Sequence, residues 1–157
     1  MAARRDRALA RRTFFLTRGA HMQINPYLNF NGTCEEAFRF YEKLLGGKIE
    51  SVSKFGDSPD AETHPAMRDK VIHARLEIDG QVIMGSDAPE GYYSKPQGNY
   101  LSINVDKPAE ARRIFDALAE KGEVHMPFAK TFWAAGGFGM VADRFGTPWM
   151  VNCEAAR

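Results

Sequence analysis

The sequence predicts an α+β domain built from two similar βαβββ modules that follow one another along the chain. Residues 27–31 (YLNFN) and 100–104 (YLSIN) share the alternation of apolar and polar residues that half-buried strands show. Each is followed by a stretch with a helical stripe of apolar residues. With 157 residues, 44% of them hydrophobic, the chain can bury one sizeable core but is too short for two ordinary domains.

The two predicted helices carry apolar residues at the same intervals, i, i+3, i+4, i+7 and i+8. These are Ala37, Phe40, Tyr41, Leu44 and Leu45 in the first helix and Ala111, Ile114, Phe115, Leu118 and Ala119 in the second. Thr33 and Glu36 have the spacing of a capping box at the first helix start. Cys34 would lie in the first turn, where the helix dipole lowers a thiol pKa. A packing role is the alternative for this cysteine.

Three strands are predicted after each helix. They cover 48–55, 71–78 and 81–87 in the first half and 124–133, 138–144 and 147–153 in the second. A single half would leave one face of its sheet uncovered, so the two halves form one unit. We therefore expect a curved mixed sheet with helices on its convex side and an open concave side. One domain spans 22–154, with modules at about 23–88 and 98–154.

Residues 1–21 form a basic N-terminal extension that we expect to be disordered and dispensable for stability. They contain six arginines and one aspartate, a net charge of +5. An upstream start codon chosen in error, an organellar targeting segment and a basic arm for an anionic partner are the three interpretations. The remaining residues carry a net charge of −4, because the whole chain carries +1.

Composition excludes several classes of function. No run of about 20 apolar residues is present, so no membrane-spanning helix is predicted. A mildly acidic body argues against a nucleic-acid partner. Two cysteines are too few for a disulfide scaffold and indicate a reducing compartment. We predict a cytoplasmic location, with organellar targeting by residues 1–21 as the alternative.

Strand alternation places a mixed polar and aromatic set of side chains on the concave side. The predicted ligand-binding residues are Tyr27, Arg75, Met84, Ser86, Tyr100, Ser102, Asn104, Trp133 and Met150. His73 faces the same side and is the candidate for acid–base catalysis, with a hydrogen-bonded structural histidine as the alternative. Such a face suits a small-molecule site. A subunit or domain interface lined by the same residues is the other interpretation.

Several short segments resemble the vicinal oxygen chelate superfamily, which includes glyoxalase I, bleomycin and fosfomycin resistance proteins and extradiol dioxygenases. They are 26–32 (PYLNFNG), 34–37 (CEEA), 73–74 (HA), 86–87 (SD), 132–134 (FWA), 138–139 (FG), Asp143, 145–146 (FG), 148–150 (PWM) and Asn152. The match is closer to the PhnB-like branch and covers about 22–154. The resemblance implies the paired-module fold and, together with open sheet edges, a homodimer.

The resemblance also implies where a metal would lie. Superfamily members that do metal chemistry hold a divalent ion with His, Glu or Gln on the first and last strand of each module. The corresponding positions here are Asn25 or Tyr27, Met84, Tyr100 and Met150. Thioethers and neutral phenols are poor ligands for such ions. We therefore predict no metal ligands and no cofactor, while a divalent metal is not excluded.

The sequence thus predicts a small-molecule binder that acts in the concave cleft without the usual divalent metal. Tyr27 and Tyr100 are expected to approach one another across that cleft, with Met84 and Met150 beneath them. The alternative is a metal-dependent or His73-assisted lyase, isomerase or transferase of the glyoxalase type. A methyltransferase, sometimes associated with this branch, would need a glycine-rich turn between strand and helix for S-adenosylmethionine, and none is found. Whether the modules pair within one chain or between two copies stays open.

Overall fold

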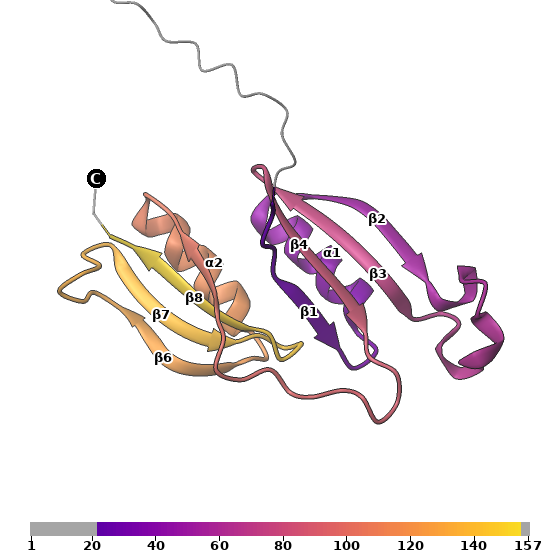
Figure 1. Ribbon diagram of the computed structural model, residues 1–157. Coiled ribbons are helices and arrows are strands. Elements are labelled where there is room, and N and C mark those ends of the chain that lie inside the picture. Colours follow the sequence, from indigo (N-terminus) through magenta and orange to yellow (C-terminus); the bar gives the residue numbers. More distant parts are fainter. Residues whose placement is uncertain (1–21, 155–157) are drawn as a thin grey trace, which may run out of the picture.

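Both predicted modules are present in the computed structural model, which describes residues 22–154 (Figure 1). The extension 1–21 and its predictions lie outside the described residues. The first module comprises β1 (Tyr27–Phe30), α1 (Cys34–Leu45), β2 (Lys48–Lys54), β3 (Val71–Ile78) and β4 (Gln81–Asp87), with three short 3-10 turns between β2 and β3. The second comprises β5 (Leu101–Asn104), α2 (Pro108–Ala119), β6 (Glu123–Ala129), β7 (Gly137–Ala142) and β8 (Pro148–Cys153).

Each module forms its own four-stranded mixed sheet. The strand orders are β1-β4-β3-β2 and β5-β8-β7-β6, with β1–β4 and β5–β8 parallel and the other pairs antiparallel. Figure 1 shows the two sheets beside one another, with β1 and β5 at their inner edges and each helix packed on its own sheet. The prediction of α+β modules with helices on one side is confirmed. The strands form two hydrogen-bonded sheets, where a single curved sheet was expected.

One hydrophobic core joins the two modules. Tyr41 on α1 packs edge-to-face on Trp149 of β8, with ring centroids 5.2 Å apart. Phe38 of α1 and Phe115 of α2 are buried in the same cluster. Gly139 on β7 leaves room for Phe115, because a Cβ atom at this position would lie 2.5 Å from the ring. The predicted helical stripes therefore face a shared core, in which Phe38 is more deeply buried than Phe40.

A buried carboxylate ties the first module to the second. Asp143, between β7 and β8, is 4% exposed. It accepts hydrogen bonds from the Tyr41 hydroxyl at 2.5 Å and from the Trp149 indole N–H at 2.8 Å. It also accepts the backbone N–H groups of Phe145 and Thr147, at 2.8 and 3.0 Å. Burial and the adjacent Asp143 charge raise the pKa of Tyr41 well above its ordinary value, so its hydroxyl stays a donor.

Strand β3 departs from strict alternation at its start, and one predicted strand boundary was wrong. Val71 is in the core and Ile72 is half-buried, because the β2–β3 register shifts between Ser53 and Lys54. The strand predicted over 124–133 ends at Ala129, where a turn closed by the Ala134 carbonyl begins. No helix within residues 22–154 is long and apolar enough to cross a membrane.

Candidate functional site

The concave face of the first sheet carries a stacked tyrosine–histidine pair. Tyr27 is 46% exposed and stacks on His73 of β3, with ring centroids 5.7 Å apart. The Tyr27 hydroxyl lies 3.2 Å from His73 Nδ1, which fixes the orientation of both rings. Met84 of β4 is directly opposite Tyr27 in the parallel ladder. The structure thus brings together three of the residues that the sequence predicted for the site.

Two further polar pairs lie on this face. Arg75 of β3 forms an ion pair with Glu50 of β2. The Ser86 hydroxyl donates to Asn29 Oδ1 at 3.3 Å. Since the guanidinium of Arg75 already has a carboxylate partner, the face offers hydrogen-bonding groups but little net charge to attract an anion.

A second tyrosine–histidine pair lies on the other sheet. The Tyr100 hydroxyl is 2.8 Å from Nδ1 of His125, a β6 residue that the sequence did not single out. Tyr100 occupies the same place in the repeat as Tyr27, yet its histidine comes from a different strand. Trp133, 46% exposed, follows β6 and packs on Phe138 of β7 with centroids 5.6 Å apart.

Three methionines form a row across the second sheet. Met126 is paired with Met140, and Met140 is paired with Met150. Ser102 of β5 continues the row opposite Met150. Directly paired residues share one face of a sheet, with Cβ atoms about 4.5–5.5 Å apart. Because the flanking Gly139 faces α2 and Val141 is fully buried, the row lies on the opposite, concave face and presents half-buried thioethers.

Sequence reasoning missed two members of this row. Met140 follows from the alternation of β7, a signal that was available. Met126 does not, because register shifts on either side of it interrupt the alternation of β6. Next to the row, Asn152 donates to Asn104 Oδ1 at 3.1 Å, and Asn104 Nδ2 lies 3.5 Å from the Ser102 hydroxyl.

A groove of about 800 Å³ separates the two modules. Of the predicted site residues, Tyr100, Ser102 and Asn104 line it, together with residues 23–26 and the turn between β3 and β4. The other predicted ligand-binding residues are placed on the sheet faces and do not line this groove: Tyr27, Arg75, Met84, Ser86, Trp133 and Met150. Each of the two tyrosines contacts a histidine of its own sheet: Tyr27 contacts His73, and Tyr100 contacts His125.

The donor set does not fit a divalent ion of the kind that the resemblance implies. Tyr27 and Met84 lie side by side on the first sheet, and Met150 lies on the second. Neutral thioethers and phenols bind hard or borderline divalent ions poorly. Residues 22–154 contain no group of three or more His, Cys, Asp or Glu side chains placed to hold a metal ion.

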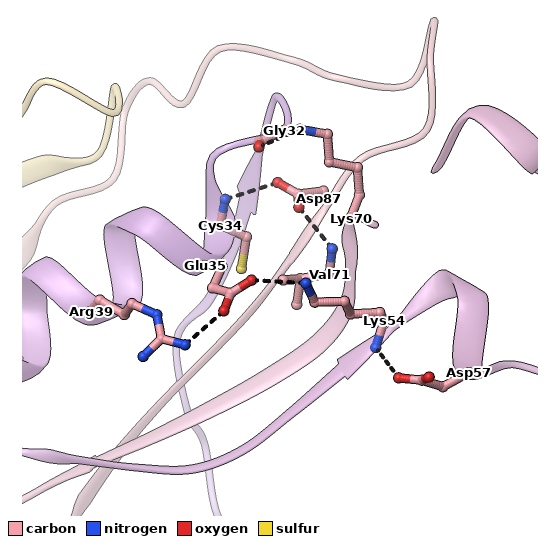
Figure 2. Close-up of polar contacts among 9 residues, drawn as sticks. All are labelled: Gly32, Cys34, Glu35, Arg39, Lys54, Asp57, Lys70, Val71 and Asp87. Carbon is pink, nitrogen blue, oxygen red and sulfur yellow. Dashed lines mark hydrogen bonds and ion pairs between the residues drawn. The ribbon is translucent and has the colours of Figure 1, made fainter. Parts of the chain in front are cut away.

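Figure 2 shows that the start of α1 is capped by Asp87, a residue of strand β4. Asp87, at the end of β4 and 2% exposed, accepts the backbone N–H groups of Cys34 and Val71, both at 2.9 Å. Thr33 makes no side-chain hydrogen bond to the helix, so the predicted capping box was wrong. A carboxylate from β4 satisfies the helix start instead, and it ties α1 to β3 and β4 at one point.

The same arrangement changes the expected chemistry of Cys34. Burial of the thiol raises its pKa, and the charges of Asp87 and Glu35 raise it further. The prediction that the helix dipole lowers this pKa was therefore wrong, because desolvation and two nearby carboxylates outweigh it. Cys34 packs in the core as an unreactive thiol.

Comparisons with known proteins agree with this architecture. Residues 22–152 match the family model described as 3-demethylubiquinone-9 3-methyltransferase. Protein YjdN from Escherichia coli (strain K12) is 36% identical over 140 residues, covering 83% of this chain and 95% of YjdN.

Two solved structures are similar over most of their length. Protein PA1353 from Pseudomonas aeruginosa is 51% identical with a TM-score of 0.77, covering 85% of this chain and 98% of that one. A putative 3-demethylubiquinone-9 3-methyltransferase, PhnB protein, from Bacillus cereus is 27% identical with a TM-score of 0.73, covering 84% and 99%. A glyoxylase/bleomycin resistance protein/dioxygenase domain from Frankia shares the fold, with 13% identity, a TM-score of 0.57 and coverage of 87% and 100%. The chain therefore belongs to the PhnB-like family described as 3-demethylubiquinone-9 3-methyltransferase, and it shares its fold with a glyoxylase/bleomycin resistance protein/dioxygenase domain.

Proposed function

We propose that this protein binds a small, flat, uncharged molecule on the concave faces of its sheets, without a divalent metal. The observation that carries the proposal is the composition of those faces. Accessible aromatic rings of Tyr27 and Trp133 stand beside half-buried thioethers, while the one cation of the predicted site, Arg75, is paired with Glu50. Aromatic rings and methionine side chains offer polarisable, adaptable contacts to a flat apolar body.

We further propose that the protein acts as a homodimer, because the sheet edges differ in how they are protected. The outer strand β2 carries charged residues such as Lys48 and Glu50, and the outer strand β6 contains Pro127 and irregular pairing. Such features block edge-to-edge association. The inner strands β1 and β5 consist of residues without charge or proline, so they leave unpaired backbone groups for a second copy.

The dimer has a direct test. Light scattering of the full chain at micromolar concentration should give twice the chain mass of 17.6 kDa. The Val105 N–H donates to the Asn152 carbonyl of β8, so the N–H of Ser102, three residues earlier, points to the open edge of β5. Replacing Ser102 by proline removes this edge N–H and should shift the protein toward the monomer, whereas Val124→Pro on the outer strand β6 should not. A single species at the chain mass in the unmodified protein would contradict the proposal.

Binding is tested with N-phenyl-1-naphthylamine, a neutral probe whose fluorescence rises in apolar surroundings. Tyr100→Ala is expected to weaken its binding by about 1–3 kcal/mol, the range for losing a buried aromatic contact. Tyr92→Ala is the matched control, because Tyr92 is 80% exposed in the linker between the modules. No rise in fluorescence with the unmodified protein, or equal weakening by both variants, would contradict the proposal.

A metal-independent acid–base enzyme of the lyase or isomerase type is the second candidate. The Tyr27–His73 pair favours it, because a hydrogen-bonded phenol and imidazole on an open face can exchange a proton with a ligand.

Metal analysis of the purified protein distinguishes both candidate functions from glyoxalase-type metal chemistry. One divalent ion per chain that survives dialysis would overturn both.

A further inference from the structure

One polar atom on the second sheet has no partner. The side-chain oxygen Oδ1 of Asn152 is buried and accepts no hydrogen bond from residues 22–154. Its amide nitrogen is used, donating to Asn104 Oδ1 at 3.1 Å, so the side chain is held in place by one end only. Leaving a buried acceptor unsatisfied costs about 1–3 kcal/mol, and such groups in native proteins call for an explanation.

The surroundings of this atom are those of a binding surface. Asn152 on β8 is paired with Phe138 of β7, on whose ring Trp133 packs. Met150 precedes Asn152 by two residues on the same face, and Met140 is paired with Met150. An acceptor on a face that also carries two thioethers and a phenyl ring, with an indole packed on that ring, is typical of a ligand pocket, in which few polar groups fix the orientation of an apolar body.

We infer that Asn152 is a specificity-determining residue whose Oδ1 accepts a hydrogen bond from a hydroxyl or N–H group of the ligand. The ligand class is an uncharged aromatic compound that carries one such donor, with its ring against Trp133, Phe138 and the methionine row. This inference rests on the proposed function and deepens it. The ring contacts supply affinity for flat molecules in general, and the orphaned oxygen selects those that can donate.

The origin of the selectivity is the difference between two bound states. In the protein alone Asn152 Oδ1 is already buried and unpaired. A ligand with a donor relieves that cost by forming the missing hydrogen bond, whereas a ligand of the same shape without a donor leaves the oxygen as it was. Sites built around a hydrogen-bonding group reject analogues that lack its partner more strongly than apolar pockets reject changes of size.

The test compares two probes that share a ring system and an oxygen atom. 1-Naphthol can donate from its hydroxyl, and 1-methoxynaphthalene cannot. Calorimetric titration of the full chain should show 1-naphthol binding about tenfold tighter. In Asn152→Leu the two probes should bind within twofold of each other. Asn152→Asp, which keeps an acceptor at this position, should retain the preference, and it covers the case in which the leucine variant does not fold.

Asn99→Leu is the matched control, because Asn99 is exposed in the linker before β5. It should leave the tenfold preference unchanged. Equal affinity of both probes for the unmodified protein overturns the inference about Asn152 and leaves the proposed function standing. A preference that persists in Asn152→Leu overturns the assignment to this residue. Binding of neither probe overturns both the inference and the proposed function.

Discussion

Replacing Asp143 by alanine is expected to lower the free energy of unfolding by about 3–5 kcal/mol. Its carboxylate accepts four hydrogen bonds at a position that is 4% exposed. The substitution leaves the buried N–H groups of Trp149 and Thr147 without their carboxylate acceptor, while the Tyr41 hydroxyl keeps Thr147 Oγ1 at 3.0 Å. Each orphaned donor costs about 1–3 kcal/mol. The turn between β7 and β8 can relax in part, so the expected loss of stability is smaller than the largest sum of these costs.

Urea unfolding followed by tryptophan fluorescence measures this effect, since Trp149 lies within the network. Tyr41→Phe should cost only about 1 kcal/mol, because it removes one donor and leaves Asp143 with three. Asp116→Ala is the matched control, because Asp116 is exposed on α2 and its carboxylate forms an ion pair with the exposed Arg112 at 3.6 Å. It should change stability by less than about 0.5 kcal/mol. A loss below 1 kcal/mol for Asp143→Ala would show that the carboxylate does not hold the modules together.

Much of the fold could be predicted because its signals are local. The repeat of residues 27–31 at 100–104, followed in each case by the same helical spacing, was enough to place both modules. The errors arose where partners distant in sequence override local chemistry. Thr33 has the spacing of a cap, yet Asp87, more than 50 residues away, takes that role. The Cys34 thiol lies at a helix start, yet its burial and two carboxylates decide its pKa.

The candidate site was predictable in composition but not in arrangement. Alternation along β1, β3 and β4 was enough to bring Tyr27, His73 and Met84 together. It did not find His125 or Met126, because β6 is irregular and its faces cannot be read from a period of two. Alternation within each strand also does not show which residues of the first sheet lie opposite residues of the second, because that depends on how the two modules pack together. The orphaned oxygen of Asn152 is visible only when hydrogen bonds are counted in three dimensions.

Asp87→Ala is expected to destabilise the protein by about 2–4 kcal/mol and to make Cys34 reactive. Asp87 accepts the N–H groups of Cys34 and Val71, so its loss orphans two buried donors at the point where α1 begins (Figure 2). In the unmodified protein the Cys34 thiol is buried and its pKa is raised, so thiolate is scarce and iodoacetamide should not alkylate it at pH 8. Loss of the cap opens the helix start and removes a charge that raises this pKa.

Mass spectrometry of alkylated protein, read against urea unfolding, measures both effects. Asp57→Ala is the matched control, because Asp57 also accepts a backbone N–H, that of Lys54 at 3.1 Å, but at an exposed site. It should change stability by less than about 0.5 kcal/mol and leave Cys34 unmodified.

The pH dependence of stability follows from the same thiol: the unfolded chain releases the Cys34 proton above about pH 8.5, while the folded chain keeps it. Stability should therefore fall as the pH rises from 8 to 10, and Cys34→Ala should make that fall shallower. An unmodified protein whose Cys34 is alkylated as fast when folded as in urea would contradict the account of a buried, carboxylate-flanked thiol.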